Sequence, residues 1–260
     1  MPSQRIKKIQ EIKNKDAVVS VIIPSFNTLL HTKKCLESLH SWTDVPHDVF
    51  VIDNGSSDGS PELLEKDPRI TLLKSATNLG FAGACNLGIA SSRSQYVVLA
   101  NSDLLFTPRW LSRLISAVEL NDRIGLVGPI TNMAAGFQKE ILKKYTSDEG
   151  LIANSEMTNR ANRGFLLEVP FLIFFCVLIK RSVIDLIGEL DASFGLGGCD
   201  DFDFCLRSNN AGFACAIDRS TFVHHTCSQT YASNHMDYNK LLLEARDGFI
   251  KKWGLRPPFP

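Results

Sequence analysis

The chain has 260 residues, 44% of them hydrophobic, with 28 basic and 28 acidic side chains. This length allows one large α/β domain or two small ones, and the hydrophobic content can bury a substantial core, so we expect one domain. A formal net charge of zero gives no global attraction for nucleic acid, and we expect no nucleic-acid partner. The seven cysteines are odd in number and include no CxxC pair, which argues against a disulfide framework or zinc site and favours a reducing cytoplasm.

The chain begins with a basic lead over residues 1–16. This lead lacks the apolar stretch of about 7 to 15 residues that a signal peptide needs. The most apolar run covers residues 169–181, and its uncharged part is about half of the roughly 20 residues that a spanning helix needs. We therefore expect a buried strand there and no transmembrane segment. Any membrane contact would be peripheral, through the lead or the end of the chain.

The first half alternates β-branched runs with helical patterns, which is typical of βαβ units and a mainly parallel sheet. The expected strands cover residues 18–23, 49–53, 70–74, 96–100 and 124–127. The expected helices cover residues 32–40, 61–66 and 108–120, with a helical pattern also at the end of 78–92.

The pattern fades between residues 131 and 163, as is typical of a functional or mobile stretch inside a domain. Beyond it we expect the apolar strand through residue 179 and a helix over 182–187. Short strands near 213–217 and 222–224 and a helix over 237–253 complete the chain.

Polar clusters follow three of the expected strands. In an open α/β sheet the ligand site lies beyond the carboxyl ends of the strands, so we expect the clusters to converge. Each one alone is typical of a strand-to-helix turn, since Asp, Asn, Ser and Gly favour turns and caps. Together they favour a nucleotide site. The clusters are Pro24-Ser25-Phe26-Asn27, residues 53–60, and Asn101-Ser102-Asp103.

Asp103 interrupts the apolar run YVVLANSDLLF at residues 96–106. A buried charge is costly unless it is paired or coordinates a metal. A divalent cation held by one or two carboxylates and by substrate phosphates would explain this position and would neutralise a diphosphate. Asp53 suits an acceptor for the imide N–H of a base, and Ser25 and Asn27 could line the same pocket.

The acidic cluster Asp200-Asp201-Phe202-Asp203 is the second chemical signal. Crowded carboxylates repel one another, which raises at least one pKa toward values useful for a general base. The alternative is favourable charge at a helix N-terminus. Asp203 and Arg207 are four residues apart, which predicts a structural ion pair.

His224 and His225 end a β-like run. An ordinary core or surface histidine is one interpretation, and a neutral imidazole that completes a metal shell or contacts a diphosphate is the other. The glycine-rich stretch over 78–88 contains neither GxGxxG nor GxxxxGK[ST]. Its glycines at 80, 83 and 88 are better explained by close packing around a ligand or a strand.

Seven motifs in one order resemble the family 2 glycosyltransferases of the GT-A fold, and among them the bacterial rhamnosyltransferase-like members. They are VSVIIPSFN, VIDNGSSDGS, NLGFAGACNLGI, LANSDLLF, DDFDFCLR, HHTCSQT and FIKKWG. The resemblance covers about residues 18–254. It implies an α/β fold: a single GT-A-type, Rossmann-like domain over 17–260 with a mainly parallel central sheet flanked by helices. The nucleotide-sugar half would cover about 17–128 and the acceptor half about 129–260.

The resemblance also implies roles for single residues. Asp103 matches the metal ligand of the family's DxD-type motif, with Asn101 in place of the first acid. Asp201 matches the catalytic base. The late metal-site histidine falls on His225 or on His224, and the spacing to Thr230 favours His225. The implied nucleotide-sugar set is Pro24, Ser25, Asn27, Asp53, Asn78, Gly83, Asn86, Asn101, Ser102 and Asp200.

The function implied is inverting transfer of a sugar from a UDP- or dTDP-linked donor to a glycan, lipid-linked or protein hydroxyl, with Mn²⁺ or Mg²⁺. Its setting would be bacterial surface polysaccharide or glycoconjugate synthesis, in the cytoplasm or at the inner face of the membrane. Two departures from the family stand out: Asp200 replaces a glutamate, and FLIFFC replaces a glycine-containing segment that shapes the acceptor side.

Two other functions are open at this point. A binding module that has lost catalysis is favoured only by Asn101. A nucleotidyltransferase should carry a basic, glycine-rich triphosphate loop near the first strand, whereas PSFNTLL contains neither lysine nor glycine.

Overall fold

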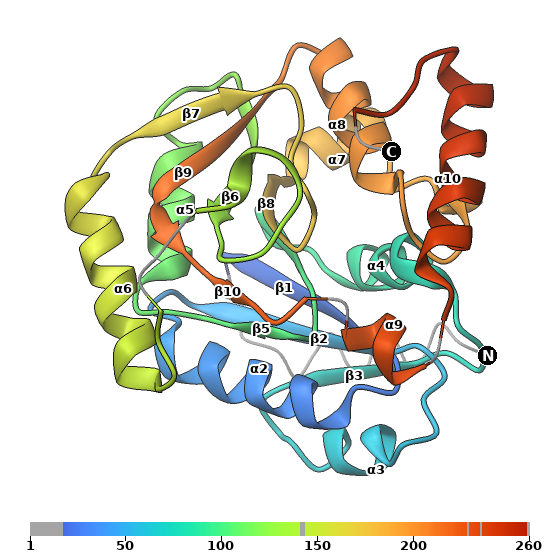
Figure 1. Cartoon of the computed structure of the whole chain (residues 1–260), viewed down its shortest axis with the longest axis horizontal. Coiled ribbons are helices and arrows are strands. Elements are labelled where there is room, and N and C mark those ends of the chain that lie inside the picture. Colours follow the sequence, from blue (N-terminus) through green and yellow to red (C-terminus); the bar gives the residue numbers. More distant parts are fainter. Residues whose placement is uncertain (1–17, 141–143, 228, 235, 259–260) are drawn as a thin grey trace.

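The structure is a computed structural model that describes residues 18–140, 144–227, 229–234 and 236–258. The basic lead over residues 1–16 lies outside the described residues. An eight-stranded sheet runs through the molecule in the order β3-β2-β1-β4-β8-β6-β9-β7, and helices cover both of its faces (Figure 1). Four of its seven strand pairings are parallel. The α/β fold with a mainly parallel sheet is therefore confirmed.

The first half of the chain forms the parallel part of the sheet. Its strands are β1 (Val19–Ser25), β2 (His47–Asp53), β3 (Thr71–Lys74) and β4 (Tyr96–Ala100), and its helices are α2 (Leu29–Trp42), α3 (Ser60–Leu64) and α4 (Gly80–Ser91). In β1, Val19, Val21 and Ile23 pack in one apolar cluster with α2, whereas Ile22 packs with α4 on the other face. Burial on both faces explains why this strand is a continuous apolar run.

The second half of the chain contributes four more strands to the large sheet, with parallel and antiparallel pairings, and the helix that begins with the acidic cluster at residues 200–203. Its strands are β6 (Ile124–Ile130), β7 (Leu166–Val169), β8 (Cys176–Lys180) and β9 (Ala214–Phe222). Its main helices are α5 (Trp110–Val118), α6 (Asp148–Ala161), α7 (Arg181–Ile187) and α8 (Asp200–Asn210), with 3₁₀ turns η1 (Gly136–Gln138) and η2 (Ala192–Phe194). β8 lies antiparallel between β4 and β6. A small second sheet pairs β5 (Leu104–Leu105) with β10 (His224–His225), and the chain continues into α9 (Gln229–Ser233) and α10 (Tyr238–Trp253).

Two sequence expectations need correction. The weakly patterned stretch contains a regular helix, α6, whose buried face includes Asn154, Ser155 and Thr158 beside Leu151. Because that face is mostly polar, it leaves little apolar periodicity. The expected single strand over 169–181 is two strands: β7 ends at Val169, and β8 begins at Cys176. The apolar residues between them leave the sheet.

One glycine shows why the parallel sheet packs so closely against α4. A Cβ atom built on Gly88 would lie 2.5 Å from Cγ2 of Ile22 in β1. A side chain there would force the helix away from the strand, which confirms the expected close packing at this position.

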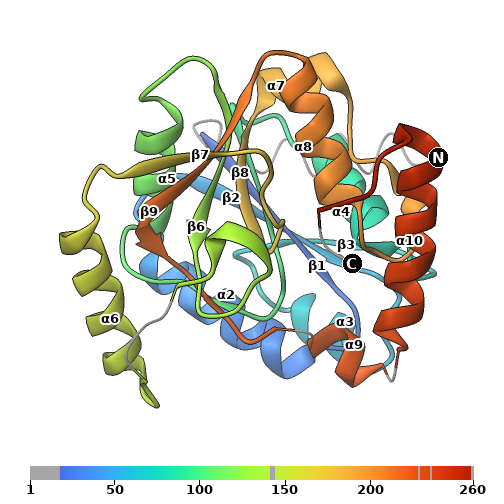
Figure 2. The same cartoon turned by 45° about the horizontal axis from the view of Figure 1, so that its top comes forward.

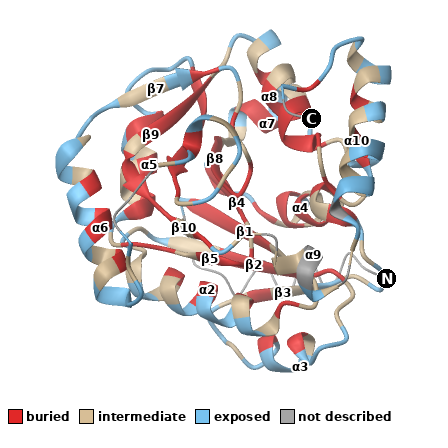
Figure 3. Cartoon of the chain, viewed as in Figure 1, coloured by how far each residue is buried: buried red, intermediate tan, exposed pale blue. Residues whose placement is uncertain are grey.

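The last long helix, α10, stands at the edge of the molecule beside α8 (Figure 2). Its end is attached by Lys252, whose Nζ lies 2.6 Å from both Asp191 Oδ2 and Asp203 Oδ1. Trp253 Nε1 donates to the same Asp203 oxygen at 2.8 Å. Figure 3 shows the contrast in burial between the central sheet and the outer surface of α10. Among the helices of the described residues, none has the length and apolar character needed to cross a membrane.

Candidate active site

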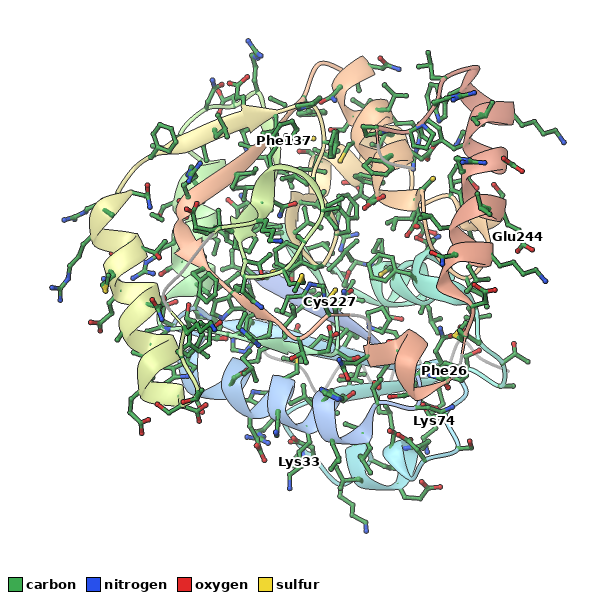
Figure 4. All side chains as sticks on the ribbon, in the orientation of Figure 1. Phe26, Lys33, Lys74, Phe137, Cys227 and Glu244 are labelled. Carbon is green, nitrogen blue, oxygen red and sulfur yellow. The ribbon has the colours of Figure 1, made fainter. Side chains whose placement is uncertain are left out.

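The carboxyl ends of β1 and β4 open onto a pocket of about 600 Å³. Its other walls are residues 173–175 before β8, residues 196–202 leading into α8, and α10. Figure 4 labels two of the wall residues, Phe26 after β1 and Cys227 after β10. The wall contains nine of the predicted site residues: Pro24, Ser25, Asn78, Asn101, Ser102, Asp103, Asp200, Asp201 and His225. The predicted convergence of strand-end clusters is thus present in the fold.

Asp103 and His225 meet although they are far apart in the chain. The short pairing of β5 with β10 sets His225 opposite Leu104, and the amide of Thr226 donates to the Asp103 carbonyl at 3.1 Å. As a result His225 Nε2 lies 3.3 Å from Asp103 Oδ1, and both side chains are buried. The ring of His225 also stacks on Phe175, with centroids 5.3 Å apart.

The contact made by Nδ1 of His225 determines which ring nitrogen is free to bind a ligand. Nδ1 lies 3.0 Å from the carbonyl oxygen of Met133. A carbonyl can only accept, so Nδ1 donates to it. Nε2 lies 3.3 Å from both Asp103 Oδ1 and Asn101 Nδ2 and is the nitrogen left to bind a cation. His224 differs: its Nδ1 lies 2.5 Å from the hydroxyl of Tyr145, and it is not in the described pocket wall. Between the two histidines, the structure brings His225 into the site.

The Asp103–His225 pair fits a divalent cation. A carboxylate oxygen and an imidazole nitrogen are ligands that first-row divalent metals accept, and here their lone pairs face one another inside a pocket. The described residues contain no group of three or more His, Cys, Asp or Glu ligands. A cation at this pair would therefore take further oxygens from a phosphate or from water, the usual arrangement for Mg²⁺-type sites.

Asp200 and Asp201 form the first turn of α8. Gly198 N donates to Asp200 Oδ1 at 2.9 Å, and Phe202 N donates to Asp201 Oδ1 at 2.8 Å. Burial raises the pKa of both carboxyls, and the charge of Asp200 raises the pKa of Asp201 further, to well above its usual value. A carboxyl whose pKa is raised by burial and by a neighbouring charge inside a pocket is a candidate for proton transfer.

Asp203 belongs to the same cluster but has a different environment. Arg207 Nε donates to its Oδ2 at 2.8 Å, which confirms the predicted ion pair. Lys252 and Trp253 of α10 contact its other oxygen. Asp203 is therefore a structural anchor for α10, while Asp200 and Asp201 face the pocket.

The close packing of α10 beside these acids depends on Gly198. Gly198 has a φ of +150°, and a Cβ atom built there would lie 2.5 Å from Cβ of Ala245 in α10. Only glycine allows the chain to pass this close to the helix in that conformation. The close approach places the Asp200–Asp201 turn directly beside α10.

The end of the site next to β1 and β2 is organised by amides and hydroxyls. Asp53 ends β2, is buried, and accepts from Ser56 N at 3.3 Å, but it lies outside the pocket wall. Its neighbour Asn54 does line the pocket, and donates to Asn78 Oδ1 at 2.8 Å. Asn54 was not among the predicted site residues, although it stands inside the predicted 53–60 cluster.

Asn27 also lies outside the wall, where it holds two loops together. Its amide nitrogen Nδ2 donates to Asn234 Oδ1 at 2.6 Å, and Ser57 N donates to its Oδ1 at 2.7 Å. Ser25 contacts Thr32, with 2.8 Å between the hydroxyl oxygens. These contacts tie the end of β1 to α2 and to the loop after β2.

Gly83 and Asn86 are predicted site residues that the structure does not bring to the pocket. Asn86 Nδ2 donates to the Leu190 carbonyl at 2.8 Å, and Leu190 N donates to Asn86 Oδ1 at 3.0 Å. Its amide is thus fully engaged in joining α4 to the segment before α8. Gly83 packs on α4 itself, 2.9 Å from Leu79 Cβ if a Cβ atom is built on it.

Sequence reasoning missed the α10 wall of the pocket. Leu242 and Arg246 of this helix line it. The helix itself was expected, but nothing in its sequence shows which of its faces covers a site built largely from the distant ends of β1 and β4. The 3.6-residue spacing of Leu242, Ala245, Arg246 and Phe249 is the only signal that such a face exists.

Comparison with known proteins places the chain in a sequence family. The sequence model described as "Glycosyl transferase family 2" matches residues 20–188. An N-acetylglucosaminyl-diphospho-decaprenol L-rhamnosyltransferase of Mycobacterium tuberculosis is 25% identical over 92% of this chain and 89% of its own length. The succinoglycan biosynthesis protein ExoO of Rhizobium meliloti is 22% identical, over 91% of this chain and 69% of its own length.

Solved structures agree on the fold. A mannosyltransferase of Pyrobaculum calidifontis in complex with GDP-Man and Mn²⁺ superposes with a TM-score of 0.64 at 18% identity, over 99% of this chain and 73% of that one. A structure of GalNAc-T7 with UDP, GalNAc and Mn²⁺ has a TM-score of 0.65 at 13% identity, over 82% of this chain and 44% of that one. The fold is GT-A, the resemblance to rhamnosyltransferases is confirmed, and the chain belongs to glycosyl transferase family 2.

Proposed function

We propose that this protein is an inverting glycosyltransferase that uses a divalent cation and moves a sugar from a UDP- or dTDP-linked donor to an acceptor hydroxyl. The observation that carries the proposal is the meeting of two chemical groups in one pocket. The Asp103–His225 pair lies in the wall formed by the strand ends, and the buried Asp201, whose pKa is raised, lies in another wall of the same pocket. Two solved structures of the same fold, one in complex with GDP-Man and Mn²⁺ and one with UDP, GalNAc and Mn²⁺, support it.

At the donor end, Asp103 and His225 would hold the cation, Mn²⁺ or Mg²⁺. When bound, the cation supplies Lewis-acid stabilisation of the departing nucleoside diphosphate. The hydrogen bond from His225 Nδ1 to Met133 keeps the ring in the tautomer that can ligate. The polar wall from Pro24 and Ser25 to Asn54 and Asn78 would receive the nucleoside. Asp53 behind that wall would accept from the base, once the loop around Ser56 adjusts to a bound nucleoside.

At the acceptor end, Asp201 would act as the general base. Its carboxylate takes the proton of the acceptor hydroxyl while that oxygen attacks the anomeric carbon of the donor. The bond from that carbon to the diphosphate breaks on the opposite face, and the bonding pair leaves with the diphosphate, so the configuration inverts. Asp200, fixed by Gly198 N, stays beside Asp201 and helps to keep its proton affinity high.

The names of two relatives support a proposal for the acceptor class. The mycobacterial relative is named for a diphospho-decaprenol acceptor, and the Rhizobium relative for succinoglycan biosynthesis. We propose a role in bacterial surface polysaccharide or glycoconjugate synthesis, with a glycan, lipid-linked or protein acceptor. The site of action would be the cytoplasm, at or near the inner face of the cell membrane.

A thermal-shift screen of nucleotide sugars with and without Mn²⁺ tests the proposal, because a ligand that binds only the folded state raises its stability. We expect stabilisation by UDP- or dTDP-sugars that depends on the metal, followed by slow release of free sugar from the donor that binds. Asn101 in the metal motif favours one rival, a binding module. Donor binding without any hydrolysis or transfer would support that rival, and the absence of any nucleotide binding would contradict both.

A further inference from the structure

Arg246 is a charged residue of the pocket for which the proposed reaction has given no role. It lies on α10, and its guanidinium carries a permanent positive charge. Among the described residues that line the pocket, Asp103, Asp200 and Asp201 are the acids and Arg246 is the one arginine or lysine. A guanidinium in the wall of a substrate pocket is suited to bind phosphate or carboxylate.

The side chain faces inward. Glu244, two residues earlier on α10, lies on the outer side of the helix in Figure 4. Two residues turn a helix by about 200°, so Arg246 lies on the opposite side. Leu242, one turn earlier, lines the same pocket, and Ala245 is buried against Gly198.

Arg246 has little to bind within the protein. Its Nε atom is buried and has no hydrogen-bond partner among the described residues. The same atom lies 3.7 Å from Asp247 Oδ1, beyond hydrogen-bond distance, and that carboxylate is 74% exposed. An ion pair of this kind contributes little, so the guanidinium is available for a ligand.

The position of Arg246 favours the acceptor over the donor. α10 packs on residues 194–202 in an apolar cluster with Phe202 and Cys199. Ala245, the neighbour of Arg246 on α10, packs against Gly198, two residues before Asp200. In keeping with this, the Arg246 charge opposes the rise in the Cys199 pKa that burial, Asp201 and Asp200 cause. The donor diphosphate already has its own cation site at Asp103 and His225, in the wall formed by the strand ends.

The surroundings of the charge indicate what kind of anion is bound. Leu242, Phe202, Leu196 and Pro257 line the pocket near this wall. A group that joins a sugar to an apolar chain and still carries a negative charge is a phosphate or diphosphate, because a carboxylate used in such a linkage becomes a neutral ester.

Resting on the proposed glycosyltransferase function, we propose that Arg246 binds the phosphate of an acceptor whose reacting sugar is carried on a lipid phosphate or diphosphate. The apolar residues of the α10 wall contact the first part of the lipid chain. The sugar then lies between Arg246 and Asp201, with its hydroxyl toward the base. Arg246 is thus a residue that selects the acceptor and not one that activates the donor.

Farnesyl phosphate is a suitable probe, with inorganic phosphate and farnesol as its two halves. Binding is measured by calorimetry with Mn²⁺ and UDP or dTDP at saturation, so that the donor diphosphate site is filled. We expect Arg246→Gln to weaken farnesyl phosphate at least about tenfold, the scale of a lost charge-assisted hydrogen bond. Farnesol should bind both proteins equally, and inorganic phosphate should bind the parent more weakly than farnesyl phosphate.

Lys251→Gln is the matched control, since Lys251 is exposed on the same helix and absent from the pocket wall. It should leave farnesyl phosphate affinity within about twofold, and Arg246→Lys, which keeps the charge, should lose less than Arg246→Gln. Arg246→Lys also serves as the test if the glutamine variant does not fold.

Three results would overturn the inference. They are an unchanged farnesyl phosphate affinity in Arg246→Gln, an equal loss in Lys251→Gln, or a loss of nucleoside diphosphate binding in Arg246→Gln. Equal affinity of the parent for inorganic and farnesyl phosphate would contradict the proposed contact between the pocket and the lipid chain. A parent protein that binds no nucleotide with Mn²⁺ would instead contradict the glycosyltransferase proposal, before any acceptor probe is added.

Discussion

The two ends of the pocket, which we propose bind the donor and the acceptor, are built in different ways. The donor end consists of turns that directly follow β1, β2 and β4, which are parallel neighbours in the sheet. The acceptor end consists of the first turn of α8, the segment between β7 and β8, and α10, which are held together by long-range contacts. The position of a site at strand ends is set by the sheet itself, whereas the opposite wall of the pocket depends on which helix packs over it.

Asp201→Asn should have the largest effect and should separate the two ends. We expect transfer to fall by about 10²- to 10⁴-fold, the usual contribution of a general base, while metal-dependent donor binding is retained. Single-turnover transfer and donor titration measure the two quantities. Near-normal transfer would show that Asp201 is not the base.

The same variant should be more stable than the parent at neutral pH. Burial raises the pKa of Asp201 in the folded state, so between the ordinary pKa of about 3.9 and the raised one the folded chain holds a proton that the unfolded chain releases. The parent therefore loses stability as pH rises through this window, and a neutral asparagine does not. Urea unfolding of both proteins from pH 4 to pH 8 should show a stability difference that grows with pH.

His225→Asn tests the donor end. Because it removes a proposed metal ligand, we expect the Mn²⁺ affinity, measured from thermal shifts at saturating nucleotide, to fall by more than the roughly 10- to 100-fold typical of outer-shell partners. His224→Asn is the matched control, since that ring contacts Tyr145 outside the pocket wall. If both variants lost metal dependence equally, the assignment of His225 would fail.

Lys252→Met tests the acceptor end. It removes the Lys252 contacts to Asp191 and to the fully buried Asp203 and leaves the Trp253 hydrogen bond to Asp203 in place. The loss of charged hydrogen bonds should cost about 1 to 3 kcal/mol in the free energy of unfolding. Because α10 then moves, we expect the acceptor KM to rise with donor affinity unchanged. Lys251→Met, one residue earlier and exposed, should change neither the free energy of unfolding nor the acceptor KM. A change in donor affinity would mean that the two ends are not separate.

Asn86→Ala should have the smallest effect. It removes two hydrogen bonds to Leu190, so we expect a loss of about 1 to 2 kcal/mol in stability and no change in donor affinity. Denaturant unfolding and nucleotide titration measure these. Weaker donor binding at unchanged stability would indicate that Asn86 contacts the substrate.

The sequence predicts the structure correctly where the role of a residue depends on its immediate neighbours in the chain. The apolar run before Asn101 predicts β4, and the carboxylate that follows it predicts the position of Asp103 at a strand end. The Asp203–Arg207 pair needs only helical spacing, and it is present. The prediction of one strand over 169–181 passed over Pro170, which cannot donate to a strand ladder and directly follows the end of β7 at Val169. Helix α6 was missed because its buried face is largely polar.

By itself, then, the sequence determined the α/β class, the family and the strand-end acids, because these depend on short segments whose apolar spacing and turn residues act locally. The fold placed His225 in the pocket wall, as the spacing to Thr230 favours, and only the fold made Asn86 a structural bridge and brought Arg246 to the pocket. Each of these depends on which surface packs against a distant element. A β5–β10 pairing and a helix anchored by Lys252 join residues that local pattern cannot relate.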